Sequence, residues 1–198
     1  MLLGIKITVE KTTYSLIPIF FLIIQTIFAN HSIDDVYQYI HVLDKNKSQL
    51  MLVFDIDDTV LSNKEFINFH GEFSIPNINA NHHRANLLQM RESHELYRWA
   101  VNNHIKVAFL TYRCESARLP TMKNLYQQGY RYWDQLILFQ EPCNYHEISA
   151  MRYKSNERKK LSEQGYYIVA SIGDQVSDLQ GGFADLQIKL DDPGYQTK

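Results

Sequence analysis

The apolar residues of this chain gather in short runs that are typical of buried strands. Four runs are almost continuously apolar, as expected for parallel strands covered on both faces: 50–54, 107–110, 136–139 and 167–172. A fifth run, 186–190, alternates apolar with polar residues like a strand at the edge of a sheet. The pattern therefore predicts a sheet built from these runs.

Helical patterns lie before and between the strands. Apolar residues recur at helical spacing over 33–46, and further helical patterns cover 84–103, 115–128 and 153–164. A chain that alternates strands with helices forms a parallel sheet with helices on both faces. We therefore expect an α/β fold with a Rossmann-like, doubly wound parallel sheet, in which ligands bind at the carboxyl ends of the strands.

Residues 64–83 break this alternation after the first strand. They are rich in Asn, His and Phe, contain Gly71 and Pro76, and fit no period. We predict a small cap or loop over the site, whose side chains are candidates for substrate contact. For His82 and His83 a solvated loop is the better prediction than a metal site, because no carboxylate or cysteine stands at metal-ligand spacing.

The N-terminal segment, 1–29, has the pattern of an export signal. Lys6 and Lys11 precede an apolar run over 14–28, and Ala29 offers a small residue for cleavage. We expect a secreted or periplasmic protein whose mature part, 30–198, is one catalytic domain. An uncleaved membrane anchor is the alternative, although the run is shorter than the roughly 20 apolar residues of a spanning helix.

Composition narrows the possible partners. The chain has 198 residues, a formal net charge of -2 and a pI of about 6.4, so it lacks the broad basic field that binds nucleic acid without sequence preference. Nucleic acid is therefore not an expected partner, and the sequence does not indicate an oligomeric state. The two cysteines, Cys114 and Cys143, could pair in an oxidising compartment, but their spacing does not force a bridge.

An acidic motif follows the first predicted strand. Residues two apart in a strand face the same way, so Asp55 and Asp57 of the sequence Asp-Ile-Asp-Asp-Thr present their carboxylates to one side. Two carboxylates at such a short distance repel each other unless a cation lies between them. Mg²⁺ prefers oxygen ligands of this kind. The alternative is a solvated acidic turn that ends a strand.

Two further motifs carry hydroxyl and basic groups. Thr111 and Arg113 follow the second apolar run, where a polar residue could also simply end the strand and cap the next helix. Lys154 and Arg158 lie one helical turn apart, and the alternative for them is a basic, solvated helix face.

The last motif follows the fourth apolar run. Gly173 allows a tight turn as the strand ends, and Asp174 and Asp178 come directly after it, although an acidic turn would look the same. The order of all four motifs is more informative than any one of them. Each places a polar group at the carboxyl end of a strand or at the start of a helix, and these positions open onto the same rim of the sheet.

With these motifs in this order, the chain resembles the haloacid dehalogenase (HAD) superfamily. Within it, the chain is similar to class-B-like acid phosphatases of subfamily IIIB that are related to plant vegetative storage proteins. The resemblance covers nearly everything after the signal, and it rests on five segments: 55–63, Gly129-Tyr130 with Trp133, Tyr153-Lys154 with Arg158, 173–179, and Lys189-Leu190 with Pro193 and Tyr195.

The resemblance implies a magnesium-dependent phosphatase that acts on small phosphate monoesters. Asp55 would attack phosphorus and form an aspartyl phosphate. Asp57 would act as general acid and then general base, and its backbone carbonyl would meet the metal. Asp55 and Asp174 would be the other metal ligands, and Asp178 would act through water or support the site.

The remaining site residues would handle the phosphoryl group. Thr111, Arg113 and Lys154 are the implied substrate contacts: Thr111 would donate a hydrogen bond to a phosphoryl oxygen, and Lys154 would offset the negative charge. Arg158 is an implied supporting residue. The chain departs from its relatives at Tyr112, where a glycine is common, and at Val176, where plant relatives have tryptophan.

Two other readings compete with the phosphatase. A receiver domain of a response regulator also combines carboxylates, a threonine and a lysine, but it places the accepting aspartate on a middle strand and the lysine last. A catalytically silent storage or binding protein on the same fold is the stronger rival. Against it, the chain retains Asp55, the nucleophile that a silent relative is expected to have lost.

Overall fold

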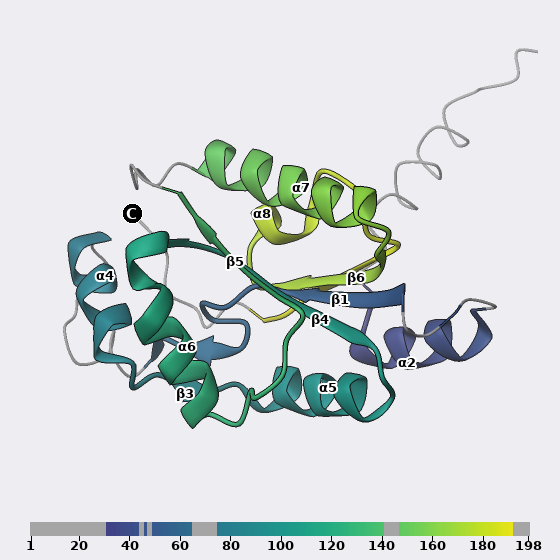
Figure 1. The fold of residues 1–198 in the computed structure, drawn as a ribbon, viewed down its shortest axis with the longest axis horizontal. Helices are drawn as coiled ribbons and strands as arrows, with labels where there is room; N and C mark the ends of the chain where they lie inside the picture. The colour runs from purple at the N-terminus through teal and green to yellow at the C-terminus, as the bar shows by residue number, and fades with distance from the viewer. Residues whose placement is uncertain (1–30, 44–45, 47–48, 65–74, 141–146, 192–198) are drawn as a thin grey trace, which may run out of the picture. The chain divides into compact units, whose positions relative to one another are not determined.

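A parallel sheet organises the part of the chain that the computed structural model describes, which is residues 31–43, 46, 49–64, 75–140 and 147–191. Its five strands pair in the order β5-β4-β1-β6-β7 (Figure 1): β1 (Leu50–Phe54), β4 (Lys106–Cys114), β5 (Gln135–Phe139), β6 (Tyr167–Gly173) and β7 (Leu186–Lys189). All five predicted strands are present, and the alternating one, β7, lies at an edge.

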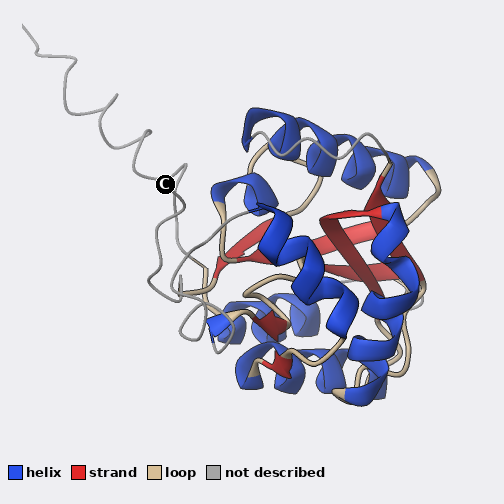
Figure 2. Cartoon of the chain, turned by 90° about the vertical axis from the view of Figure 1, so that its left-hand side faces the viewer, coloured by secondary structure: helices blue, strands red, loops and turns tan. Residues whose placement is uncertain are grey.

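The sheet is covered on both faces because its central strands are apolar on both. In β1 the side chains of Leu50, Leu52 and Phe54 join one core cluster, while Met51 and Val53 join another on the opposite face. Figures 1 and 2 show helices on both sides of the sheet. The doubly wound α/β fold predicted from the sequence is thus confirmed.

Four helices correspond to the predicted helical patterns: α2 (Ile33–Val42), α5 (Arg91–Asn102), α6 (Arg118–Gln127) and α7 (Glu147–Glu163). A 3-10 turn, Glu115–Ala117, precedes α6, and α7 begins earlier than expected. Helix α2 begins after a capping box, in which the Ser32 hydroxyl accepts from the Asp35 amide and the Asp35 carboxylate accepts from the Ser32 amide.

The prediction of one helix over 84–103 is wrong at its N-terminal end. Arg84 instead ends helix α4 (Ile75–Arg84), and Leu88–Gln89 forms a short strand, β3, that pairs antiparallel with β2 (Leu61–Ser62). Tertiary pairing with β2 overrides local helical spacing here. The irregular segment predicted at 64–83 is also partly helical, and Pro76 is compatible with this because it lies in the first turn of α4.

Three predictions, for the signal, the cap and the cysteine pair, fall wholly or partly outside the described residues. The predicted signal, 1–29, and residues 65–74 of the predicted cap are among the residues not described. In the described part, no helix has both the length and the apolar character needed to cross a membrane. Cys114, the last residue of β4, is disulfide-bonded, and Cys143 lies outside the described residues.

The carboxyl edge of the sheet contains the point where the strand order reverses. From β1 the chain builds outward through β4 to β5, then returns to the other side of β1 for β6 and β7. In open α/β sheets, ligands bind in the crevice at such a reversal. A ligand site is therefore expected at the carboxyl ends of β1 and β6.

Tyr130 anchors the loop that follows β1. Its fully buried ring packs edge-on against Phe109 and Tyr97, with ring centroids 5.6 Å and 4.9 Å away. Its hydroxyl donates a hydrogen bond of 3.1 Å to the carbonyl oxygen of Val60, which lies between the acidic motif and β2. The aromatic core and the site loop are thus joined through one side chain.

Replacing Tyr130 with Phe should lower the free energy of unfolding by about 1 kcal/mol, because one buried hydrogen bond is lost while the packing is kept. Urea denaturation would measure this difference. Tyr126→Phe is the matched control, since the Tyr126 ring is exposed and its change should be close to zero. Equal unfolding midpoints for the two variants would show that the Tyr130 hydroxyl does not anchor the loop.

Candidate active site

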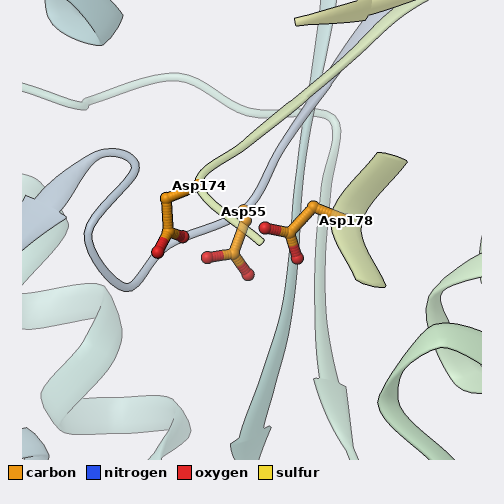
Figure 3. Close-up of side chains that lie close together, drawn as sticks. All are labelled: Asp55, Asp174 and Asp178. Atoms are coloured by element: carbon orange, nitrogen blue, oxygen red, sulfur yellow. The ribbon is translucent and has the colours of Figure 1, made fainter. Parts of the chain in front are cut away.

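Three carboxylates meet at the reversal point of the sheet. Asp55 directly follows β1, Asp174 directly follows β6, and Asp178 lies on the short helix α8 (Val176–Leu179). Oxygen atoms of the three side chains lie within 4.8 Å of one another, and all three residues are buried (Figure 3). The backbone of Asp55 extends the pairing of β1 with β6, because its amide donates to the Ile172 carbonyl at 2.9 Å.

Gly173 allows Asp178 to approach this cluster. A Cβ atom on Gly173 would lie 2.2 Å from the Asp178 side chain, so any larger residue would force the carboxylate away. The same carboxylate accepts a hydrogen bond of 2.9 Å from the backbone amide of Gln175, which fixes the start of α8. The glycine that the sequence indicated as a turn residue is therefore also a steric requirement.

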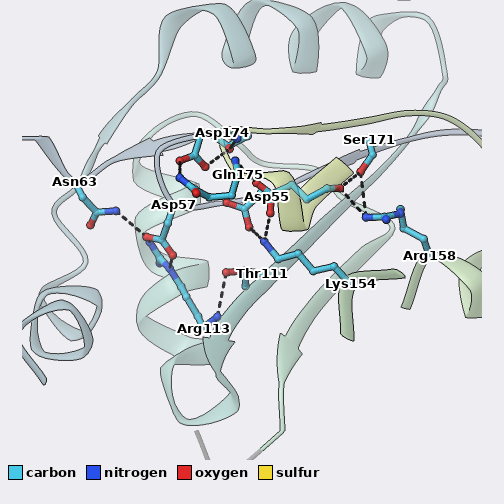
Figure 4. A network of polar contacts seen from close by, with 12 residues as sticks. Asp55, Asp57, Asn63, Thr111, Arg113, Lys154, Arg158, Ser171, Asp174 and Gln175 are labelled. Carbon is cyan, nitrogen blue, oxygen red and sulfur yellow. Dashed lines mark hydrogen bonds and ion pairs between the residues drawn. The ribbon is translucent and has the colours of Figure 1, made fainter. Parts of the chain in front are cut away.

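Lys154 places an ammonium group between two of these carboxylates. Its Nζ donates to Oδ1 of Asp55 (Figure 4). It also donates to Oδ1 of Asp178, and the side chain is buried. The alternative of a solvated basic face is wrong for Lys154, although it holds for Lys159 and Lys160, which are exposed. Burial lowers the pKa of the Lys154 ammonium, but Asp178 and Asp55 outweigh burial and raise that pKa above its usual value.

The cluster holds more negative charge than Lys154 can offset. Burial, followed by the nearby Asp178 carboxylate, raises the pKa of Asp55 well above its usual value. The same two causes raise the pKa of Asp174 to about 6. Crowded, buried carboxylates with too few cations fit a divalent ion with oxygen ligands, such as Mg²⁺. The residues present thus suit the metal that the sequence predicted.

The side chain of Asp57 is not part of this cluster. Arg113 binds its carboxylate with two hydrogen bonds, from Nε to Oδ2 at 2.9 Å and from Nη2 to Oδ1 at 2.8 Å (Figure 4). Oδ1 also lies 3.1 Å from Nε2 of His82 and accepts from Nδ2 of Asn63 at 3.0 Å. The Asp57 side chain thus has three partners of its own, and a cation shared with Asp55, as the strand spacing suggested, stays a prediction.

The two carboxylates of the motif therefore have opposite environments. Burial raises the pKa of Asp57, but Arg113 and His82 outweigh it and hold that pKa well below the usual range. The pKa of Asp55 moves in the other direction. Burial and the Arg113 guanidinium also lower the pKa of His82, which favours its neutral form.

Thr111 lies inside β4 rather than at its end. Regular pairing of β4 with β5 stops at Leu110, and the register shifts before Cys114, so Thr111 lies where the strand becomes irregular. Its buried hydroxyl accepts a hydrogen bond of 3.1 Å from the Arg113 amide. Arg113 also donates from Nη1 to the Thr121 hydroxyl at 3.1 Å, which fixes the guanidinium on α6.

Thr59 and Asn63 hold the loop between β1 and β2. Thr59 links the acidic motif to the end of β6, since its hydroxyl lies 3.3 Å from Oδ1 of Asp174 and accepts from the Asp174 amide at 3.1 Å. The amide of Asn63 donates to Oδ1 of Asp58 at 2.7 Å, and burial raises the pKa of Asp58 to about 7. Asn63 thus contacts both Asp57 and Asp58.

Arg158 holds the backbone around α8 and does not contact the three carboxylates. The fully buried guanidinium donates to the carbonyl oxygens of Asp178 at 2.6 Å, of Gly182 at 3.0 Å, and of Gln180. Burial lowers its pKa to about 10. The Ser171 hydroxyl donates to the same Asp178 carbonyl at 2.7 Å, so strand β6 and helix α7 together fix the backbone of α8.

Sequence reasoning missed three residues of the site. Thr59 and Asn63 stood in the motif but were given no role. His82 was expected in a solvated loop, and this prediction is wrong, because α4 buries it against Asp57. A histidine in a polar segment carries no periodic signal, so only the tertiary position of α4 reveals it.

The fold and the site define a haloacid-dehalogenase-type protein, and comparison with known families agrees. Residues 24–198 match the model of the HAD superfamily, subfamily IIIB (acid phosphatase). The chain belongs to this family.

Among curated proteins, the chain is 36% identical over 150 residues to the stem 28 kDa glycoprotein of Glycine max, which covers 72% of this chain and 58% of that protein. It is 32% identical over 148 residues to acid phosphatase 1 of Solanum lycopersicum, with 72% and 57% covered. It is 30% identical over 157 residues to vegetative storage protein 2 of Arabidopsis thaliana, with 76% and 58% covered. The chain thus spans somewhat over half the length of these relatives.

A solved structure supports the fold. The class C acid phosphatase from Bacillus anthracis with tungstate bound aligns with a TM-score of 0.60 at 20% identity, covering 75% of this chain and 60% of that one. At this identity the likeness concerns the arrangement of strands and helices.

Replacing Arg158 with Met should lower the free energy of unfolding by about 3 kcal/mol or more, because buried carbonyl oxygens lose their charged donors. Arg158→Lys should recover only part, since one ammonium cannot replace the planar fork. Urea denaturation in EDTA would measure both. Lys159→Met, an exposed control on the same helix, should stay within about 0.5 kcal/mol of the wild type. An Arg158→Met loss as small as that of the control would contradict the supporting role.

Proposed function

We propose that the protein is a magnesium-dependent acid phosphatase that hydrolyses small phosphate monoesters through an aspartyl phosphate. The observation that carries this proposal is the buried cluster of Asp55, Asp174 and Asp178 with Lys154 at the carboxyl edge of the sheet. Membership in an acid phosphatase family supports the same reaction class.

In the first step, a carboxylate oxygen of Asp55 attacks the phosphorus atom, and the bond from phosphorus to the ester oxygen breaks. Asp57, which Arg113 and His82 keep ionised before substrate binds, takes up a proton from solvent and gives it to the departing oxygen, so the alcohol leaves neutral. Asp55 is then the phosphorylated group, and Asp57 is a carboxylate.

In the second step, Asp57 takes a proton from a water molecule that attacks the phosphorus. The bond to Asp55 breaks, phosphate leaves, and both carboxyl groups return to their starting states once Asp57 releases its proton to solvent. Asp55, Asp174 and the backbone carbonyl of Asp57 would hold a hard divalent cation, and Asp178 would support the site. The cation would reduce the repulsion between the anionic nucleophile and the phosphate dianion.

Lys154 and Thr111 are proposed to bind the phosphoryl group. The Lys154 ammonium already neutralises Asp55, and it can shift part of its interaction to a phosphoryl oxygen as charge develops there. The Thr111 hydroxyl would donate to another oxygen. The proposed substrate contact of Arg113 would use its remaining N–H groups, since Nε and Nη2 bind Asp57 and Nη1 binds Thr121.

A catalytically silent storage role is the second candidate. The relatives that are named vegetative storage proteins favour it. A silent relative is expected to have lost the nucleophile. This chain retains Asp55, which is buried beside Lys154. Activity measurements separate the two functions directly.

For residues 1–29 we propose an export signal that is removed, which leaves residues 30–198 as one phosphatase domain with a cap at about 64–83. Relatives named as glycoproteins support secretion. Mass spectrometry of the N-terminus of the protein from its native source should find a chain that begins near Asn30. An intact Met1 in a soluble intracellular fraction would contradict export, and an intact Met1 in membranes would favour the anchor.

Asp55→Asn should lower turnover of a chromogenic aryl phosphate by several orders of magnitude, because the amide keeps the shape but loses the charge that attacks phosphorus.

The wild type should need Mg²⁺ or a similar hard cation and lose its activity in EDTA. Its activity should rise as the pH falls into the mildly acidic range, because Arg113 and His82 hold the pKa of Asp57 well below its usual range and each drop in pH increases the small protonated fraction that can act as the acid.

Asp34→Asn, at an exposed position on α2, is the matched control and should leave turnover unchanged. Wild-type activity in the Asp55→Asn protein would show that the aspartyl-phosphate mechanism is wrong. A wild type that binds Mg²⁺ but hydrolyses no monoester would support the storage function instead.

A further inference from the structure

We propose that His82 is a positioning residue for Asp57, and that it leaves Oδ2 of Asp57 as the oxygen that carries the proton. The inference rests on the proposed function, in which Asp57 is the general acid and base. It assigns a chemical role to the predicted cap, because His82 lies in the last turn of α4.

The contact between His82 and Asp57 has a defined direction. Nε2 of His82 lies 3.1 Å from Oδ1 of Asp57, and a carboxylate bound by Arg113 can only accept hydrogen bonds. Nε2 therefore carries the hydrogen and donates it. The other ring nitrogen, Nδ1, is buried and has no hydrogen-bond partner in the described part of the chain. Among the described residues, the His82 ring therefore makes its polar contact with Asp57.

The donors around Asp57 are distributed unequally between its oxygens. Oδ1 receives three contacts, from His82, Arg113 and Asn63, whereas Oδ2 receives only one, from Nε of Arg113. An ionised carboxylate oxygen offers about two lone pairs, so Oδ1 is saturated and Oδ2 retains accepting capacity. A proton moving to or from substrate is therefore expected at Oδ2.

Helix α4 also reaches Asp57 by a second, indirect route. Asn81 is buried next to His82, and its Nδ2 lies 3.5 Å from Oδ1 of Asn63. The Nδ2 group of Asn63 in turn donates to Oδ1 of Asp57. The neighbouring His83 is exposed. The two adjacent histidines thus differ in burial and contact, which provides a control within the same helical turn.

The expected effect depends on the leaving group. An alkyl alcohol leaves slowly unless it is protonated, whereas a nitrophenol leaves readily as an anion, so a misplaced general acid harms alkyl esters more. His82→Phe should lower kcat on an alkyl phosphate by about ten- to a hundredfold, with KM little changed, because a small displacement of a catalytic group is enough for such losses. On a nitrophenyl phosphate the loss should be only a few-fold.

Three further variants separate positioning from packing. His82→Gln keeps a long side chain with an N–H donor and should restore most of the alkyl activity. His82→Asn is polar but too short to reach Oδ1, and it should behave like His82→Phe; it also carries the test if the Phe variant does not fold. His83→Phe, the exposed control, should keep the wild-type ratio of alkyl to aryl kcat, because His83 does not contact Asp57 in the structure.

The test also includes Asp57→Asn alone and together with His82→Phe. If His82 acts through Asp57, the double variant should be no slower on the alkyl ester than Asp57→Asn. Equal losses on both esters, or no rescue by Gln, would overturn the positioning role while leaving the phosphatase proposal intact. A wild type without activity on any monoester, or an Asp57→Asn protein that treats both esters like the wild type, would instead overturn the proposed function itself.

Discussion

The crowding of buried carboxylates around a single ammonium group is the constraint on which the site depends. At 4.8 Å, two unit charges repel by about 3 kcal/mol even at an effective dielectric constant of 20. Lys154 relieves part of this repulsion by contacting both Asp55 and Asp178. Because Lys154 comes from α7 and the carboxylates follow β1 and β6, helix and sheet must pack correctly before the charges can balance. A cation binding there would thus stabilise the folded chain as well as complete the site.

The positions of the strands could be read from the sequence because burial on both faces leaves a local record. A run such as Leu50–Phe54 must be apolar throughout, and a polar motif at its end marks the carboxyl edge. That placement puts Asp55, Asp174 and Asp178 at the same edge of the sheet. Strand order is not written locally, but once β1 and β6 are neighbours the motifs after them have to meet.

The parts that sequence reasoning did not predict depend on contacts between distant segments. The strand β3 exists only through its pairing with β2, and α4 is a weakly patterned helix whose importance comes from what it touches. The same is true of Asp57. Its spacing from Asp55 suggested a shared cation but gave no sign of Arg113, which comes from a different strand and binds the Asp57 carboxylate. Charge partners that arrive from elsewhere in the fold cannot be recognised from spacing within one motif.

The opposite environments of Asp55 and Asp57 are consistent with the different roles proposed for the two carboxylates of this motif. Asp55 lies beside other carboxylates and an ammonium, whereas Asp57 is bound by Arg113, His82 and Asn63. His82 comes from the predicted cap, so the cap and the proposed acid-base group cannot vary independently. Replacing 64–83 as a block would remove His82 together with any specificity residues, and a slower enzyme could then be mistaken for one with altered substrate preference. Cap exchanges that retain Asn81 and His82 avoid this confusion. They keep the contacts that hold Asp57, while the cap surface toward the proposed substrate changes.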